Sequence, residues 1–201
     1  ELAFAIRGSI VPAIAPRIVM LMLFSAALVW GHNRFGLVPE IEGTGFTVFG
    51  IALSLFLGFR NNAAYDRWWE ARKLWGGLLA DLRSFAREAQ IFVADEPRQQ
   101  AIIRLALVFL HLHRVNLRKL PEDTRAREIA GALAPEGQPL PAPCVALDRI
   151  ADDITAASRN GSLDGFGAKA LQERLASITL QQSGCERIAN TPLPYVYSLL
   201  I

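Results

Sequence analysis

The sequence is poor in the residue types from which catalytic and metal sites are built. It has three histidines, His32, His111 and His113, and two cysteines, Cys144 and Cys185, among 201 residues. The cysteines lie far apart and form no CxxC pair, which argues against a disulfide framework and against a structural zinc site. His111 and His113 are two residues apart and so point to different faces of a helix, which favours packing over shared metal ligation. We therefore expect neither a metal site nor a cofactor.

The sequence motifs of common enzymes and nucleic-acid-binding proteins are also missing. No Gly-rich phosphate loop, HExxH or GxSxG occurs in the chain, which argues against the enzyme classes that use them. The net charge of +2 is too small for a nucleic-acid-binding protein, which normally carries a basic stripe. We therefore predict that the chain is not an enzyme and binds no nucleic acid. A membrane enzyme that uses paired carboxylates is kept as an alternative, although Asp152 and Asp153 are more simply a solvated helix face.

Charge is scarce in the first third of the chain, where two long apolar segments lie. Residues 1–59 hold only six of the 40 charged residues. The segment Ile10–Trp30 has the ~20 mostly apolar residues that a membrane-spanning helix needs, with a buried core helix as the alternative. The segment Phe46–Phe59 has no charge, but as a helix it is only about 21 Å long, against ~30 Å of hydrocarbon core. Such a short segment is typical of a helix shielded by other protein, as a pore-lining helix is.

The charges that flank these segments predict their orientation. Arg7 and Arg17 lie near the start of the first segment, and Arg60, Arg67 and Arg72 follow the second. An excess of positive charge marks the cytoplasmic side of a membrane. We therefore expect a multi-pass protein of the cell membrane, with the soluble helices that follow residue 75 in the cytoplasm.

The remainder of the chain has the periodicity of amphipathic helices. Apolar residues recur every three or four positions in 75–93, and 102–112 is apolar nearly all round, which predicts the centre of a soluble bundle. Further helices are expected at about 122–133, 144–158 and 167–183, and no strand-like alternation occurs. The predicted fold class is all-α, with membrane helices joined to a cytoplasmic helical bundle.

A third membrane helix is expected to begin near the end of the chain. Thr191 can cap a helix, and Pro192 at its first position loses no hydrogen bond. The apolar run after it breaks off at Ile201, so we expect the natural chain to continue. The predicted organisation is a membrane region at 1–75, a cytoplasmic helical region at 76–190 and the start of this third helix at 191–201.

One apolar seam in the second segment could form a gate. Ile51, Leu55 and Phe59 are spaced four residues apart and therefore share one helix face. An ordinary seam between packed helices has this spacing, and so does a hydrophobic constriction that gates a channel by dewetting. Spacing alone leaves both interpretations open.

Two longer blocks of sequence resemble a known family. The stretch FLGFRNNAAYDRWWEARKLWG at 56–76 is similar to the signature of bestrophins, and to that of their bacterial homologues in particular. The stretch GCERIANTPLPY at 184–195 resembles a second bestrophin block, which precedes the third membrane helix. The residues that carry the resemblance are Arg60, Asn61, Asp66, Arg67, Trp68, Trp69, Pro192 and Pro194.

The resemblance implies a specific architecture. Bestrophins are ring-shaped homopentamers with one ion pore on the five-fold axis, and the pore narrows at a neck of three apolar rings. The matching positions here are Ile51, Leu55 and Phe59. A second constriction lies at the cytoplasmic exit, where Phe166 is the matching residue. Arg67, Trp68 and Trp69 are expected to pack and anchor below the neck.

The function predicted from the resemblance is that of an ion channel subunit that conducts small ions, chloride or other anions first among them. Because apolar rings carry no charge, a cation-selective channel of the same family is one alternative. A membrane-anchored scaffold or signalling protein is an alternative of another class. The expected partners are further copies of the chain, the lipid membrane and the permeating ions.

Overall fold

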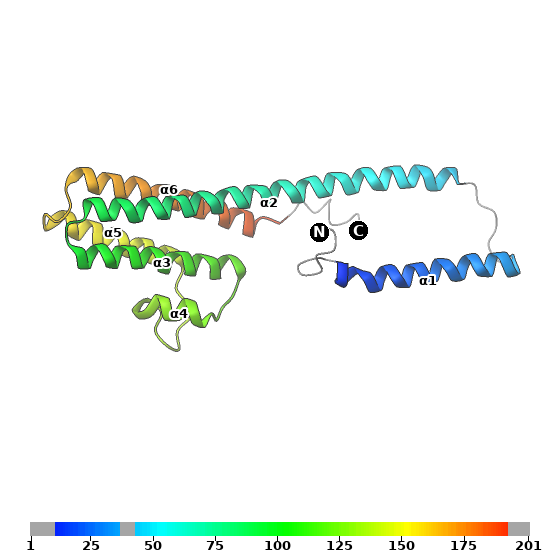
Figure 1. Cartoon of the computed structure of the whole chain (residues 1–201), viewed down its shortest axis with the longest axis horizontal. Helices are drawn as coiled ribbons and strands as arrows, with labels where there is room; N and C mark the ends of the chain where they lie inside the picture. The colour runs from blue at the N-terminus through cyan, green and yellow to red at the C-terminus, as the bar shows by residue number, and fades with distance from the viewer. Residues whose placement is uncertain (1–10, 37–42, 193–201) are drawn as a thin grey trace, which may run out of the picture. The chain divides into compact units, whose positions relative to one another are not determined.

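Helices are the only regular elements in the residues that the computed structural model describes, 11–36 and 43–192 (Figure 1). The predicted all-α fold class is therefore confirmed. The chain divides into two units, Glu1–Ser54 and Leu55–Ile201. The predicted start of a third membrane helix lies almost wholly outside the described residues, and the predicted domain boundaries stay predictions.

The first unit contains helix α1, Val11–Phe35, and the beginning of helix α2, Thr44–Phe92. The predicted segment Ile10–Trp30 corresponds to α1, which continues five residues further. Its large apolar side chains are exposed, with Met22 65% and Trp30 66% accessible. By length and composition alone, the stretches Ile14–Phe35 and Thr44–Phe92 could each cross a membrane.

Helix α2 is much longer than the sequence patterns predicted. It runs unbroken for 49 residues, or about 74 Å at 1.5 Å per residue. The prediction of separate segments at Phe46–Phe59 and 75–93 is wrong, because both belong to this one helix. The residues between them, 60–74, contain no proline and several strong helix formers, so nothing in them ends the helix. The short apolar segment is thus one part of a long helix that carries on into the second unit.

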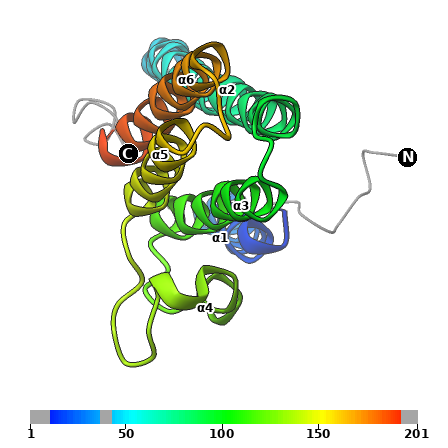
Figure 2. The same ribbon diagram turned by 90° about the vertical axis from the view of Figure 1, so that its left-hand side faces the viewer.

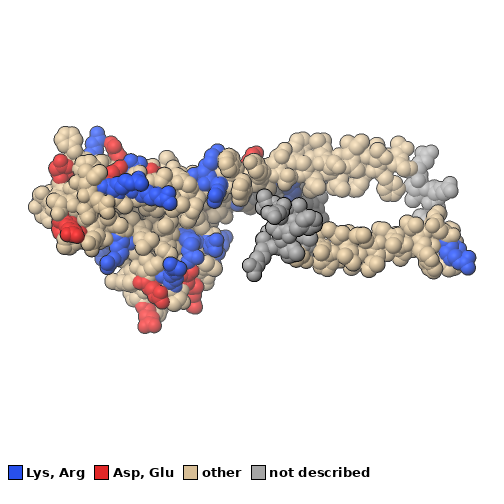
Figure 3. Space-filling view, in the orientation of Figure 1, with Lys and Arg blue, Asp and Glu red and all other residues tan. Residues whose placement is uncertain are grey.

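Five further helical elements complete the second unit. They are α3 (Glu96–Arg118), α4 (Thr124–Ala130), the 3₁₀ turn η2 (Gly131–Leu133), α5 (Pro143–Arg159) and α6 (Gly165–Asn190). The helices predicted at 102–112, 122–133, 144–158 and 167–183 correspond to these, with ends displaced by up to seven residues. Seen end-on, α5 lies between α6 and α3, and α4 lies on the outer side of α3 (Figure 2). Charged side chains are frequent on the surface of this bundle, whereas α1 is nearly free of them (Figure 3).

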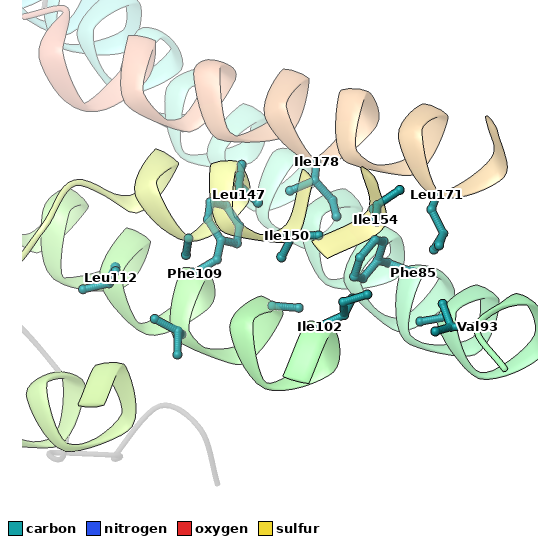
Figure 4. Packing of buried hydrophobic residues seen from close by; sticks show 14 of the residues in the cluster. Phe85, Val93, Ile102, Phe109, Leu112, Leu147, Ile150, Ile154, Leu171 and Ile178 are labelled. Atoms are coloured by element: carbon teal, nitrogen blue, oxygen red, sulfur yellow. The ribbon is translucent and has the colours of Figure 1, made fainter. Parts of the chain in front are cut away.

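The hydrophobic core of the bundle joins all of its long helices (Figure 4). Phe85 of α2, Phe109 of α3, Ile150 of α5 and Ile178 of α6 are completely buried. Burial of a side chain of this size contributes ~1.5–3 kcal/mol. The stretch 102–112, predicted to be the centre of the bundle, supplies Phe109 and four other buried residues, which confirms that prediction.

The start of α6 is seated closely on the end of α2. The Asp164 carboxylate accepts a hydrogen bond from the Gly167 backbone N–H at 2.7 Å, which caps the helix. A Cβ atom at Gly167 would lie 2.6 Å from Cβ of Phe92. Because atoms cannot approach so closely, the contact requires glycine. This contact fixes one end of the α2–α6 pair.

Candidate functional site: the pore helix and its attachment to the bundle

The three predicted neck residues lie on α2 with their side chains exposed. Ile51, Leu55 and Phe59 are 67%, 57% and 53% accessible on the single chain. Leu53 and Phe56, on other faces of the same helix, are exposed to a similar extent, at 50% and 48%. Among the residues that the structure describes, none covers the apolar part of α2 on any side, and exposure does not by itself single out the seam.

Aromatic residues of the signature follow the apolar part of α2. The ring of Tyr65 lies 5.8 Å from that of Trp68, and the ring of Trp68 lies 5.9 Å from that of Trp69, measured between centroids. All three side chains are about half exposed on the single chain. The expected anchoring role of the two tryptophans stays a prediction. Asn61 and Asp66 are exposed, as is Pro192, while Arg60 is half-buried and Pro194 lies outside the described residues.

Helices α2 and α6 run antiparallel in a constant register. A Cβ at Gly184 would lie 2.8 Å from Leu74 Cδ2, and a Cβ at Gly77 would lie 3.0 Å from Gln181 Cδ. Asp81 accepts a hydrogen bond from the Ser177 hydroxyl at 2.6 Å. Each advance of three or four residues along α2 is thus matched by an equal step back along α6. The two glycines allow the helices to approach closely.

The end of this helix pair nearest the apolar part of α2 is held by two reciprocal contacts, which we call the Arg67 clamp. The Arg67 guanidinium of α2 donates hydrogen bonds to the backbone carbonyls of Ile188 and Thr191, at the end of α6. In the opposite direction, Arg187 of α6 donates to the Glu70 carboxylate of α2 at 2.6 Å. Arg67 was predicted to be an anchoring residue, but its partners could not be read from the sequence.

A second set of ionic contacts joins the helices further along. The Arg174 guanidinium of α6 lies 3.0 Å from Asp81 and 2.8 Å from Glu88, both on α2. Hydrogen bonds to Glu88 are the largest cause of a raised pKa for Arg174. The Arg174 contacts lie about 21 Å (Asp81) and about 32 Å (Glu88) from Arg67 along α2, at 1.5 Å per residue. They hold the helix pair independently of the Arg67 clamp.

The predicted aperture residue and two of the histidines, His111 and His113, also fall in the second unit. Phe166 lies in the first turn of α6 and is 83% exposed. His113 is completely buried, stacked against Trp75 at 6.0 Å and Phe109 at 5.6 Å between ring centroids. This arrangement confirms that His113 is a packed residue. In 11–36 and 43–192, no group of three or more His, Cys, Asp or Glu side chains could hold a metal ion.

Burial also sets the protonation of His113. Desolvation lowers the pKa of its imidazole below the usual value, and the nearby Glu186 carboxylate raises it by a smaller amount. The His113 Nδ1 atom lies 3.8 Å from Glu186 Oε1, too far for a hydrogen bond. The sequence indicated that His113 packs, but its partners could not be read from it, because they come from three different helices.

Comparison with known proteins decides the family. A model of bacterial and fungal bestrophin proteins matches residues 1–201. The chain belongs to the bestrophin family. Family membership confirms the resemblance drawn from the sequence, and with it the predictions of a membrane location and of a channel rather than an enzyme.

Individual bestrophin relatives and solved structures agree with this assignment. The chain is 43% identical to a voltage-dependent anion channel-forming protein of Mesorhizobium japonicum; the match includes 100% of this chain and 66% of that protein. It is 36% identical to a voltage-dependent anion channel-forming protein of Escherichia coli, with 98% of this chain and 66% of that one covered. A crystal structure of a bacterial bestrophin homologue from Klebsiella pneumoniae matches with a TM-score of 0.79 at 27% identity, over 94% of this chain and 72% of that one. The chain thus spans about two thirds of the length of the curated relatives it matches.

Proposed function

We propose that the chain is a subunit of a homopentameric channel that conducts anions through an axial pore lined by α2. The observation that carries the proposal is the 43% identity, over the whole chain, to a protein described as a voltage-dependent anion channel-forming protein. The unshielded apolar part of α2 supports it. Exposed apolar surface of this extent needs a covering of lipid or protein, and further copies arranged around an axis supply one while leaving one face towards a pore.

The seam of Ile51, Leu55 and Phe59 is proposed to face that axis as three rings. Apolar rings gate by excluding water, and an ion that passes them must shed part of its hydration shell. Phe166, exposed at the start of α6, is proposed as the constriction at the cytoplasmic exit. The charges that flank the apolar segments support a multi-pass orientation with the bundle in the cytoplasm, and the proposed organisation keeps the boundaries 1–75, 76–190 and 191–201.

Ion flux into liposomes tests the proposed function. The purified protein is reconstituted, and the reversal potential is measured while anions and cations are exchanged separately. We expect the reversal potential to follow the chloride gradient. A reversal potential that follows the cation gradient would overturn anion conduction in favour of the cation-selective alternative.

Oligomeric mass in detergent is measured on the same sample, and we expect five copies. An assembled protein that conducts no ions would favour the membrane-anchored scaffold alternative. A monomer or dimer would overturn the ring.

A further inference from the structure

The Arg67 clamp satisfies backbone groups that a helix cannot satisfy alone. The last four carbonyls of any α-helix lack intrahelical partners and carry the negative end of the helix dipole. The Arg67 guanidinium donates to two carbonyls at the end of α6, those of Ile188 and Thr191. A guanidinium presents several N–H donors in a fixed fork, whereas a lysine ammonium is a compact point charge. The contact is therefore specific for arginine.

The clamp is joined by unbroken helix to Phe59, the end of the apolar seam that lies in the same unit. Phe59 precedes Arg67 by eight residues of the same helix, about 12 Å at 1.5 Å per residue. Residues 60–66 contain neither glycine nor proline, and α2 is unbroken over this stretch. Sharp kinks in helices arise mainly at such residues. A displacement of Arg67 relative to α6 is therefore passed on to Phe59 with little loss.

We propose that Arg67 is a positioning residue for conduction: by fastening α2 to the end of α6, it fixes where α2 stands and so sets the width of the neck at Phe59. The inference rests on the proposed channel function. The reciprocal contact of Arg187 with Glu70, one turn further along α2, supports the same attachment. The contacts of Arg174 lie further from the seam and hold the bundle together without determining the neck.

The structure separates these two roles and thereby supplies a matched control. Arg174 donates to both Asp81 and Glu88, so its loss removes at least as many contacts as the loss of Arg67. Arg67→Gln removes a contact close to the neck, and Arg174→Gln removes contacts about 21–32 Å further along α2. Because each variant keeps the other anchor and the buried core, both are expected to fold and assemble.

Single-channel recording of the natural protein in planar bilayers tests the proposal, with assembly checked by mass in detergent. A hydrogen bond to a charged group has a strength that corresponds to a change of about tenfold or more in an equilibrium constant. We therefore expect Arg67→Gln to change open probability by about tenfold or to alter unitary conductance clearly. Arg67→Lys should restore only part of the wild-type behaviour, because lysine lacks the fork. Arg174→Gln should lower thermal stability while leaving the unitary current unchanged.

The outcomes distinguish the positioning role from the channel function itself. If the wild-type protein carries no current, the proposed function fails. If the wild type conducts and assembled Arg67→Gln has wild-type currents, the positioning role is overturned. Equal changes of current in Arg67→Gln and Arg174→Gln would overturn it too, because the effect would then not depend on closeness to the neck. If Arg67→Gln does not assemble, Arg67→Lys decides: assembled channels with wild-type currents would overturn the role, and altered currents would support it.

Discussion

Replacing the three proposed neck residues by alanine tests whether the seam faces a pore or a packed interface. Ile51, Leu55 and Phe59 are more than half exposed on the single chain. If they were buried in a helix interface, each truncation would cost ~2–5 kcal/mol. The three together would then approach or exceed the ~5–15 kcal/mol that keeps a typical protein folded. Side chains around an open axis have little packing to lose, so we expect the triple variant to fold and to assemble.

The same variant should conduct more ions than the wild type. The three rings extend over about 12 Å of helix, and no polar group on them replaces the hydration that an ion sheds. Smaller side chains widen and wet the neck, which lowers this barrier. We expect larger unitary currents and weaker discrimination between small and large anions, measured by single-channel recording with anions of increasing size.

A control with the same chemistry lies on the other faces of α2. Leu53, Phe56 and Leu57 are 50%, 48% and 59% exposed, so their replacement by alanine removes a comparable apolar surface from the same stretch. This control should leave conductance unchanged. An assembled neck variant with wild-type currents would refute the assignment, and so would equal effects of the two triple variants. Failure of only the neck variant to assemble would favour the packed seam.

Three further predictions concern the bundle. Gly167→Ala places a Cβ 2.6 Å from Phe92 Cβ and should destabilise the protein by ~1–3 kcal/mol. Gly76 has open space around it, so Gly76→Ala should stabilise the protein by ~0.5–1 kcal/mol. Thermal unfolding measures both effects. Burial lowers the pKa of His113 in the folded protein, so as the pH falls the imidazole is protonated in the unfolded state before it is protonated in the folded state. The free energy of unfolding should therefore fall as the pH drops below about 6.5, and it should fall less in His113→Phe. Phe166→Ala should change stability by less than ~0.5 kcal/mol but increase current at the exit, and an unchanged current would contradict its role as the aperture.

The sequence predicted the helical class and the location of most helices because apolar periodicity is a local property. The apolar stretch 102–112 could be read as the bundle centre, since a helix that is apolar all round must be buried. The start of α6 was missed by only two residues, although Asp164 is a typical capping residue. These features depend on residues that are close together in the sequence, so one sequence is enough to predict them.

Features that depend on distant residues could not be predicted. Residues 60–74 are rich in charge, which indicates the end of a membrane segment but does not reveal that the helix continues. The attachment of Arg67 to α6 joins positions more than 120 residues apart, and no local pattern encodes such a pairing. The burial of His113 likewise follows from aromatic and acidic neighbours on separate helices. The candidate neck came from a family resemblance and not from periodicity, because its spacing also fits an ordinary seam.

The constant register of α2 and α6 has a consequence for how the chain tolerates changes of length. One residue inserted into α2 between Leu74 and Asp81 would turn the rest of the helix by about 100° and advance it by ~1.5 Å. The α2–α6 contacts before the insertion and those after it would then require different positions of α6 along α2. No shift of α6 along its axis could therefore restore all of these contacts. The loop at 134–142 does not have to keep a helix register, so extra residues there cost little free energy. Variation in length among proteins built on this plan should therefore concentrate in the loop and be excluded from the paired helices.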